Sequence, residues 1–269
     1  MTLVMGIVNV TPDSFSDGGR YLDPEQAVVH ARRLLAEGAS LIDVGGESTR
    51  PGAQRVSEEA ERARVVPVVQ ALAADGIRVS VDTMRASVAG AAISAGAAIV
   101  NDVSGGQADP DMVAVVADSG ADFVVMHWRE HSVGMQQHAV YADVVSDVIS
   151  ELLVQRDAAL AAGIPAERII LDPGLGFSKS WDHNWTLLRH LDRFQHLGHR
   201  LLIGASRKAF LGELLGGREP QGRDGATAGV SFWSALHDVW AVRTHDVLTQ
   251  SDAVAVARRL RHEAPLRIT

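Results

Sequence analysis

The stretch that decides the fold is Leu201-Leu202-Ile203-Gly204-Ala205-Ser206-Arg207-Lys208. Its apolar first half predicts a short strand that is covered on both faces. The strand ends at Gly204, and the residues after it open a helix that we expect from Ala209 to Leu215. A hydroxyl, two cations and free backbone N–H groups at the start of a helix favour the binding of an anion.

A second turn of the same kind follows at Trp240-Ala241-Val242-Arg243-Thr244-His245-Asp246. Here too an apolar strand leads directly to a cation, Arg243, and then to a histidine, His245. In an eight-fold β/α barrel, the loops after strands 7 and 8 often bind phosphate. The two turns therefore predict the last two strand ends of such a barrel.

The rest of the chain supplies six further strand–helix pairs. We expect strands at Leu3–Val10, Ser40–Val44, Ile77–Val81, Ala97–Val100, Ala121–Met126 and Arg168–Leu171. We expect helices from Asp23-Pro24 to Gly38, from Ser57 to about Asp75, and at Arg85–Ser94, Asp111–Ser119, Ala142–Ala162, Trp185–Leu197 and Asp252–His262. Eight such units, with strands that are apolar rather than alternating, favour a single (β/α)8 TIM barrel over residues 1–269. An open doubly wound sheet is the alternative.

The amino-acid composition argues against several classes of partner and site. The 269 residues carry a net charge of -8, which argues against nucleic acid or an anionic membrane surface as the main partner. The absence of cysteine excludes disulfides and thiolate metal sites. No leader segment is visible, and no apolar run reaches the roughly 18 residues of a membrane span. We expect a cytoplasmic protein.

Polar groups gather where the predicted strands end. They are Asn9, Asp43, Asp82, Asn101, Met126 with His127, Asp172, Ser206 with Lys208, and Arg243 with His245. One Asp after a strand is more often a helix N-cap than a catalyst, but capping does not explain the whole set. In a barrel these side chains would converge on the mouth where barrel enzymes place their chemistry.

The carboxylates suit one kind of ligand. Asp82 and Asp172, with Asn101 between them in strand order, would accept parallel hydrogen bonds from a flat heterocycle edged with N–H donors. A metal bound by the same groups is the alternative. The histidines lack tight metal-ligand spacing, so we do not expect zinc, and we place those other than His127, His138 and His245 on the surface.

Nearly the whole chain resembles the dihydropteroate synthase family. Eight motifs carry the resemblance, each at a predicted strand end: Gly6–Gly18, Asp43–Gly52, Ser80–Thr83, Val100–Gly106, Met126-His127, Asp172–Lys179, Gly204–Lys208 and Arg243–Val247. It implies a (β/α)8 barrel that joins p-aminobenzoate to 6-hydroxymethyl-7,8-dihydropterin pyrophosphate. The products would be 7,8-dihydropteroate and pyrophosphate.

The resemblance also implies roles for residues. Asp82, Asn101, Asp172 and Lys208 would hold the pterin, with Met126 lining its slot. Arg243 and His245 would hold the pyrophosphate, and Asn9 would reach a Mg²⁺ ion bound to it. Thr49, Arg50, Pro51, Phe177 and Ser206 would shape the p-aminobenzoate pocket, with Gly204, Asp13 and Ser14 as further substrate contacts. Catalysis would fall to Asp82, Asp172, Lys208, Arg243 and His245.

Two other readings share these residues. One is a catalytically silent pterin-binding paralogue, and the other is a pterin-dependent methyltransferase barrel, which has no pyrophosphate to bind. The resemblance further implies a homodimer through outer helices and sulfonamides as inhibitors. If the chain is a synthase of this family, substitution of Arg243 by alanine should sharply weaken turnover and leave pterin binding largely intact.

Overall fold

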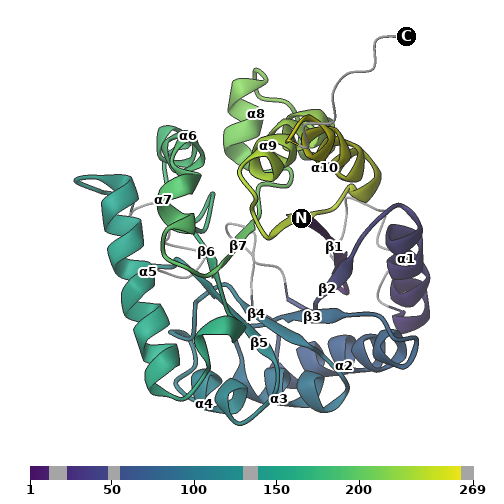
Figure 1. The fold of residues 1–269 in the computed structure, drawn as a ribbon. Coiled ribbons are helices and arrows are strands. Elements are labelled where there is room, and N and C mark those ends of the chain that lie inside the picture. Colours follow the sequence, from purple (N-terminus) through teal and green to yellow (C-terminus); the bar gives the residue numbers. More distant parts are fainter. Residues whose placement is uncertain (12–22, 48–54, 130–138, 262–269) are drawn as a thin grey trace.

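The structure, a computed structural model, describes residues 1–11, 23–47, 55–129 and 139–261. Eight parallel strands form a closed barrel in sequence order (Figure 1). They are β1 (Leu3–Asn9), β2 (Leu41–Gly45), β3 (Val79–Asp82), β4 (Ile99–Asp102), β5 (Asp122–Met126), β6 (Ile169–Asp172), β7 (Arg200–Ile203) and β8 (Ala241–Thr244). The barrel closes where Leu3 of β1 pairs with Ala241 of β8. The predicted TIM barrel is confirmed.

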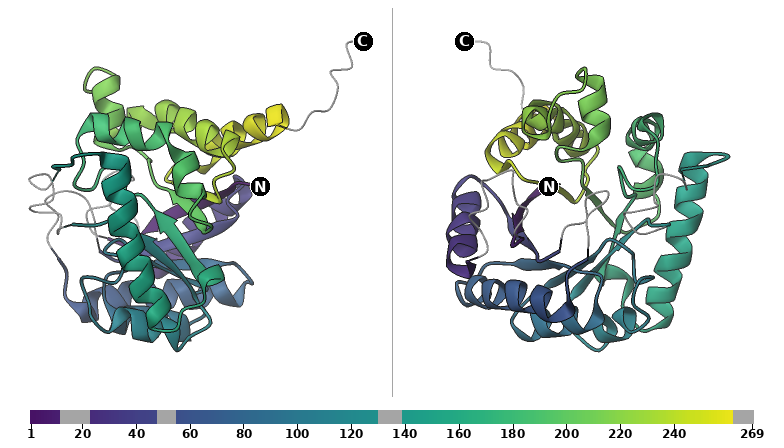
Figure 2. Two further views of the ribbon diagram at one scale, coloured as in Figure 1. Left: turned by 60° about the vertical axis from the view of Figure 1, so that its left-hand side comes forward. Right: turned by 180° about the vertical axis from the view of Figure 1, so that it is seen from behind.

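Helices surround the strands, as Figure 1 and the rotated views of Figure 2 show. They are α1 (Pro24–Ala36), α2 (Glu58–Ala74), α3 (Ala86–Ser94), α4 (Met112–Ala117), α5 (Val144–Ala161), α6 (Trp181–Arg189), α7 (Leu191–Gln195), α8 (Ala209–Leu214), α9 (Asp224–Leu236) and α10 (Val247–Arg261), with short 3₁₀ turns at Ala166–Arg168 and Pro220–Arg223. Within the described ranges, none of these helices has the length and apolar character needed to cross a membrane.

Capping side chains begin α1 and α2 where the sequence predicts. The Asp23 carboxylate accepts the backbone N–H of Glu25 at 3.0 Å, and Pro24 occupies the first helical position. The Ser57 hydroxyl accepts the N–H of Ala60 at 3.2 Å. Each cap satisfies a backbone donor that the helix itself leaves unpaired.

Three expectations about helices and histidines are wrong. The single helix predicted at Trp185–Leu197 is two helices, and α6 begins at Trp181 because Ser180 and His183 form a capping box. The break falls at His190, whose φ of -117° and ψ of 33° leave the helical region. The last helix begins at Val247 rather than Asp252. His30 lies on the buried face of α1, not on the surface.

Alternation along the strands separates the barrel into layers. Successive side chains of a strand point to opposite faces, so every second residue shares a side. One set packs outward against the helices and includes Val44, Val81, Val100, Val125 and Ile203. The other set forms an apolar layer inside the barrel: Met5, Leu41, Ile99, Val124, Ile170, Leu202 and Ala241. This inner layer supports whatever lies above it at the carboxyl ends of the strands.

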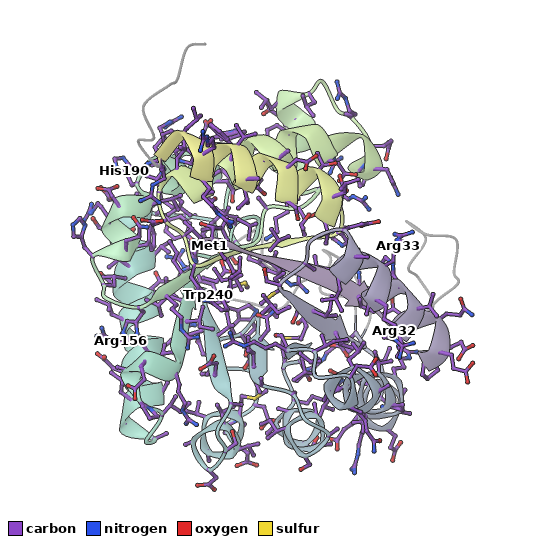
Figure 3. The ribbon with its side chains drawn as sticks, turned by 45° about the vertical axis from the view of Figure 1, so that its right-hand side comes forward. Met1, Arg32, Arg33, Arg156, His190 and Trp240 are labelled. Atoms are coloured by element: carbon purple, nitrogen blue, oxygen red, sulfur yellow. The ribbon has the colours of Figure 1, made fainter. Side chains whose placement is uncertain are left out.

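An aromatic side chain covers the amino end of the barrel. Trp240 packs against the inner layer, and the guanidinium groups of Arg78 and Arg200 lie 5.9 and 5.2 Å from the centre of its ring. Asp122 pairs with both arginines, at 2.7 and 2.8 Å. Trp240 and Met1 are labelled together in Figure 3, and the N–H of Leu3 donates to the Trp240 carbonyl. This cation–π cluster closes the end opposite the predicted site.

Candidate active site

A polar ring lies two residues beyond the apolar inner layer. Asp43 follows Leu41 by two positions, Asn101 follows Ile99, and Asp172 follows Ile170, so each pair shares the inward face. The same step places Met126, Gly204 and Arg243 above Val124, Leu202 and Ala241. The ring is thus a consequence of strand periodicity, and it lies at the carboxyl ends of the strands.

Arg243 bridges two carboxylates of this ring. Its Nε donates to Asp43 Oδ2 and its Nη2 donates to Asp82 Oδ2, both at 2.6 Å. The Asn101 amide donates to the same Asp43 oxygen at 3.0 Å. Asp43 is fully buried, and its Oδ1 has no hydrogen-bond partner within the described part of the chain. One cation therefore organises two carboxylates and indirectly orients the amide.

The sequence predicts that Arg243 contacts pyrophosphate and contributes little to pterin binding, but its contacts lie elsewhere in this geometry. The guanidinium lies against Asp82, a residue assigned to pterin, rather than apart from it. Removing a cation from a buried ion pair leaves an uncompensated charge. Substitution of Arg243 should therefore disturb both Asp43 and Asp82.

Burial shifts the charge state of Asp82. It raises the pKa of this carboxyl to about 7, while Arg243 opposes the rise and Asp43 adds to it. The protonation of Asp82 is consequently sensitive to any ligand that donates hydrogen bonds at neutral pH. Asp102, the next residue after Asn101, faces outward and instead accepts from Ser104 and Gly106, so it stabilises the turn after β4.

Asp172 and Lys208 form the opposite wall of the ring. Asp172 Oδ1 accepts the N–H of Gly174 at 2.7 Å, and burial raises the pKa of its carboxyl against the influence of Lys208. Burial lowers the pKa of Lys208 to about 8, with Asp172 opposing the change. A Cβ placed on Gly204 would lie 3.9 Å from Asp172 Oδ2, so glycine there leaves space beside the carboxylate.

An apolar slot adjoins these polar groups. Met126 packs with Met84 and Val103, and the ring of Phe177 joins the same cluster. The Lys208 ammonium lies 4.6 Å from the centre of the Phe177 ring and donates to the Leu175 carbonyl. A flat ring that enters the mouth would meet apolar walls on its faces and carboxylates at its edge.

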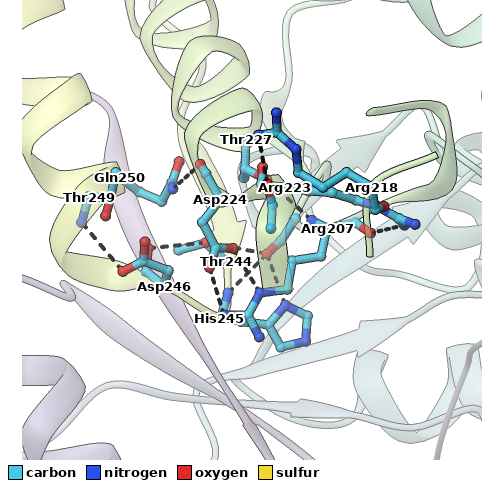
Figure 4. Close-up of polar contacts among 12 residues, drawn as sticks. Arg207, Arg218, Arg223, Asp224, Thr227, Thr244, His245, Asp246, Thr249 and Gln250 are labelled. Carbon is cyan, nitrogen blue, oxygen red and sulfur yellow. Dashed lines mark hydrogen bonds and ion pairs between the residues drawn. The ribbon is translucent and has the colours of Figure 1, made fainter. Parts of the chain in front are cut away.

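Ser206 and His245 lie together at the ends of β7 and β8. The Ser206 hydroxyl is 2.9 Å from His245 Nδ1 and accepts the His245 backbone N–H at 3.1 Å. Between Ser206 and Lys208, Arg207 adopts a left-handed backbone with a φ of 58°. Asp224 of α9 accepts hydrogen bonds from the Arg207 guanidinium at 2.7 and 2.9 Å. The Thr227 hydroxyl accepts the Arg207 backbone N–H, as Figure 4 shows. This clamp fixes a turn that an L-residue rarely adopts.

Asn9 is the residue expected to reach a metal ion. It ends β1, and a Cβ placed on Gly45 would lie 3.7 Å from both Asn9 Oδ1 and Asp82 Oδ2. Across the described ranges, no group of three or more His, Asp or Glu side chains is arranged to hold a metal. An amide oxygen is a suitable ligand for Mg²⁺, which usually keeps several waters and binds through substrate phosphates. The residues thus fit an ion carried mainly by the substrate.

Five of the expected substrate contacts, Asp13, Ser14, Thr49, Arg50 and Pro51, lie outside the described residues. One residue of the ring was noted in the sequence at a strand end but not assigned to the site. It is Asp43, whose alignment with Leu41 along β2 already indicated an inward side chain.

Comparison with known proteins decides the family. A model of the pterin binding enzyme family matches residues 5–245. A dihydropteroate synthase of Mycobacterium leprae is 52% identical over 268 residues, which cover 97% of this chain and 94% of that protein. The chain belongs to the dihydropteroate synthase family.

Solved structures of this family share the fold. A Yersinia pestis dihydropteroate synthase in a sulfonamide drug complex superposes with a TM-score of 0.93 at 41% identity, covering 97% of this chain and 94% of that one. A Xanthomonas albilineans dihydropteroate synthase with 4-aminobenzoic acid superposes with a TM-score of 0.90 at 42% identity, covering 98% and 94%. The chain is thus an enzyme of the transferase class to which dihydropteroate synthases belong.

Proposed function

We propose that this chain joins the amine of p-aminobenzoate to the methylene carbon of 6-hydroxymethyl-7,8-dihydropterin pyrophosphate, with release of pyrophosphate. The observation that carries this proposal is the buried ring of Asp82, Asn101 and Asp172 beside Lys208, in a chain of this family. Such a ring complements a flat ligand with several N–H donors along one edge.

The pterin would lie in the ring, with its faces against the Met126 slot. Asp172 and Asp82 accept hydrogen bonds from amino and ring N–H groups, and Asn101, whose amide nitrogen is oriented toward Asp43, offers its carbonyl oxygen. The Lys208 ammonium donates to an acceptor atom of the ring. These contacts also stabilise positive charge that develops on the pterin, because two carboxylates lie close to it.

The pyrophosphate would bind at the ends of β7, β8 and β1. Arg243, His245 and Ser206 supply donors there, and Asn9 offers an oxygen to Mg²⁺. Mg²⁺ bound to the pyrophosphate would neutralise charge on the departing group. Loss of one preorganised contact of this kind typically costs about 3 kcal/mol in transition-state stabilisation, or roughly a hundredfold in rate.

The bond changes then need no strong base. The carbon–oxygen bond breaks and pyrophosphate leaves with the electron pair, so the pterin methylene becomes a delocalised cation. The lone pair of the arylamine forms the new carbon–nitrogen bond, and the nitrogen afterwards loses a proton. Because an arylamine is a competent nucleophile unaided, no histidine is required as general base.

The arylamine pocket would be shaped by Phe177 and Ser206, with Thr49, Arg50 and Pro51 from outside the described residues. We propose that sulfonamides compete for this pocket, as the sulfonamide complex of the Yersinia pestis relative suggests. We also propose a cytoplasmic homodimer. Exposed apolar side chains on the outer helices support it: Trp233 of α9 and Leu248, Val256 and Leu260 of α10.

Product analysis tests the activity. Purified protein supplied with the dihydropterin pyrophosphate, p-aminobenzoate and Mg²⁺ should form 7,8-dihydropteroate, identified by mass spectrometry, in amounts equal to the pyrophosphate released. Tight pterin binding with no product would instead favour a silent paralogue. Transfer of a methyl group from a methylated pterin would favour the methyltransferase reading.

A further inference from the structure

The chain contains 23 arginines but only two lysines, and both lysines lie at this site. One is Lys208, and the other is Lys179, whose side chain is almost fully buried. Lys179 Nζ lies 2.9 Å from His127 Nδ1 and donates to the Phe177 carbonyl at 3.0 Å. A lysine is almost never buried to this extent without partners, so its contacts require an explanation.

A chain of contacts links Lys179 to the surface. His127, fully buried at the end of β5, lies with Nε2 3.0 Å from Glu151 Oε2. Glu151 of α5 also accepts from Arg129 Nε at 2.8 Å. The sequence places His127 at a strand end and does not by itself indicate a role for it. Three elements, β5, α5 and the loop after β6, are tied together through it.

Protonation fixes the direction of each hydrogen bond. Hydrogen bonds from Arg129 and His127 lower the pKa of Glu151 to about 2, so its carboxylate only accepts. Burial and the charge of Lys179 lower the pKa of His127 to about 4, so the imidazole is neutral at pH 7. A neutral ring that donates through Nε2 must accept at Nδ1, and Lys179 is the donor.

Lysine suits this position better than arginine. Burial, followed by the charge of Lys208, lowers the pKa of Lys179 well below its usual value, while Asp172 opposes the change. A lysine tolerates such a shift, whereas a guanidinium stays charged and needs a planar set of acceptors. The inner end of the chain of contacts is therefore a compact donor that needs no planar set of acceptors.

The loop that Lys179 supports contains one residue, Ser178, whose backbone conformation is disfavoured for a residue with a side chain. Three of its residues, Gly174, Gly176 and Ser178, have left-handed φ angles of 67°, 81° and 49°. Ser178 has no glycine freedom, and its carbonyl accepts from the Tyr141 hydroxyl at 2.8 Å. Several side chains thus reach in to bind the backbone of this loop.

Lys179 binds the carbonyl of Phe177, the residue whose ring the loop presents to the site. That ring lies 4.6 Å from Lys208 Nζ and packs on the cluster of Met84, Val103 and Met126. We propose that Lys179, oriented by His127 and Glu151, is a positioning residue that fixes Phe177 in the wall of the arylamine pocket. This inference rests on the proposed function, because it assigns the pocket to p-aminobenzoate.

Steady-state kinetics of Lys179→Met test the proposal. The KM for p-aminobenzoate should rise about tenfold, because an unsupported loop carbonyl lets the Phe177 ring move. The KM for the dihydropterin pyrophosphate should change less than about twofold and kcat less than about threefold, since Lys179 touches neither reacting group. Lys179→Arg should not restore the arylamine KM.

Two comparisons separate positioning from general damage. Glu151→Gln, at the outer end of the contacts, should raise the arylamine KM by a smaller factor, and Glu59→Gln on an exposed position of α2 should leave it unchanged. Adding Lys179→Met to Phe177→Ala should cause no further rise in the KM for p-aminobenzoate, because the effects of substituting residues that act as a unit are not additive.

The outcomes distinguish this inference from the function on which it rests. A wild-type protein without turnover would refute the proposed function and leave no arylamine site to position. Normal wild-type turnover with an unchanged arylamine KM in Lys179→Met would overturn the positioning role alone. Equal losses against both substrates, or full additivity with Phe177→Ala, would overturn it as well.

Discussion

Replacement of Arg243 by methionine should weaken pterin binding directly. Methionine keeps much of the apolar stem but removes both 2.6 Å hydrogen bonds to Asp43 and Asp82. Two buried carboxylates would then face each other without a cation, a situation that costs about 3–5 kcal/mol when one partner of a buried pair is removed. The protein would relieve part of this cost by keeping Asp82 protonated.

The magnitude follows from the charge state of Asp82. Its pKa is about 7 in the presence of Arg243, which acts to lower it. Without Arg243 the pKa of Asp82 rises further, so at pH 7 the carboxylate that we propose as a pterin acceptor is replaced by a neutral acid. Losing one hydrogen bond to a charged group costs roughly 1.5–3 kcal/mol, which is about a tenfold to hundredfold loss of affinity.

Calorimetry with 6-hydroxymethyl-7,8-dihydropterin gives the cleanest assay. This ligand lacks the pyrophosphate, so a lost phosphate contact cannot explain a weaker affinity. Wild-type affinity should rise with pH through about 7 as Asp82 ionises, and in Arg243→Met the rise should move to higher pH. Arg259→Met, an exposed position on α10, is the matched control.

Wild-type affinity of Arg243→Met for this pterin, with the same pH dependence, would show that the ion pair with Asp82 does not support pterin binding. That result would return Arg243 to the role expected from sequence, a contact to pyrophosphate alone. A variant that binds the pterin weakly at pH 7 but recovers at higher pH would support the ion-pair account.

Two further predictions concern stability. Folding lowers the pKa of His127 from 6.5 to about 4, because the neutral imidazole is the form that the folded protein buries. The resulting contribution of His127 to the free energy of unfolding is fully present above pH 6.5 and is lost as pH falls through about 4. That contribution is worth roughly 3 kcal/mol. The difference in unfolding free energy between wild type and His127→Gln, measured by urea denaturation, should therefore shrink over this pH range. A difference that stays constant with pH would contradict this prediction. Trp240→Ala should cost about 3 kcal/mol in unfolding free energy, at the low end for a tryptophan because Trp240 is only partly buried. Folded Trp240→Ala protein should keep the wild-type kcat, and a lowered kcat in fully folded protein would show that the cation–π cluster also shapes the site.

Local pattern was sufficient for the strands and for most of the ring. Short apolar runs that end in Asn, Asp or Arg fix both the strand and, through the two-residue period, which side chains point inward. Asp82, Asn101 and Asp172 could be predicted for this reason. The same reasoning reaches the correct helix starts at Asp23 and Ser57, because a capping side chain acts on a residue only two or three positions away.

Contacts between residues that are far apart in the sequence could not be predicted from local pattern. Asp43 pairs with Arg243 across 200 positions, and only the closure of β8 onto β1 brings their strands near each other. The buried link from Lys179 to His127 likewise spans 52 positions and depends on the exact path of the loop after β6. The break between α6 and α7 carries no glycine or proline, so nothing in the local sequence marks it.

We propose that the ring of carboxylates and the cations beside it serve one reaction between two substrates. The most direct test is the initial rate of pyrophosphate release from the dihydropterin pyrophosphate with Mg²⁺ as p-aminobenzoate is varied from zero to saturation. The account predicts release that rises with p-aminobenzoate to a plateau and matches the dihydropteroate formed. Binding of the pterin without release at any p-aminobenzoate concentration would contradict it.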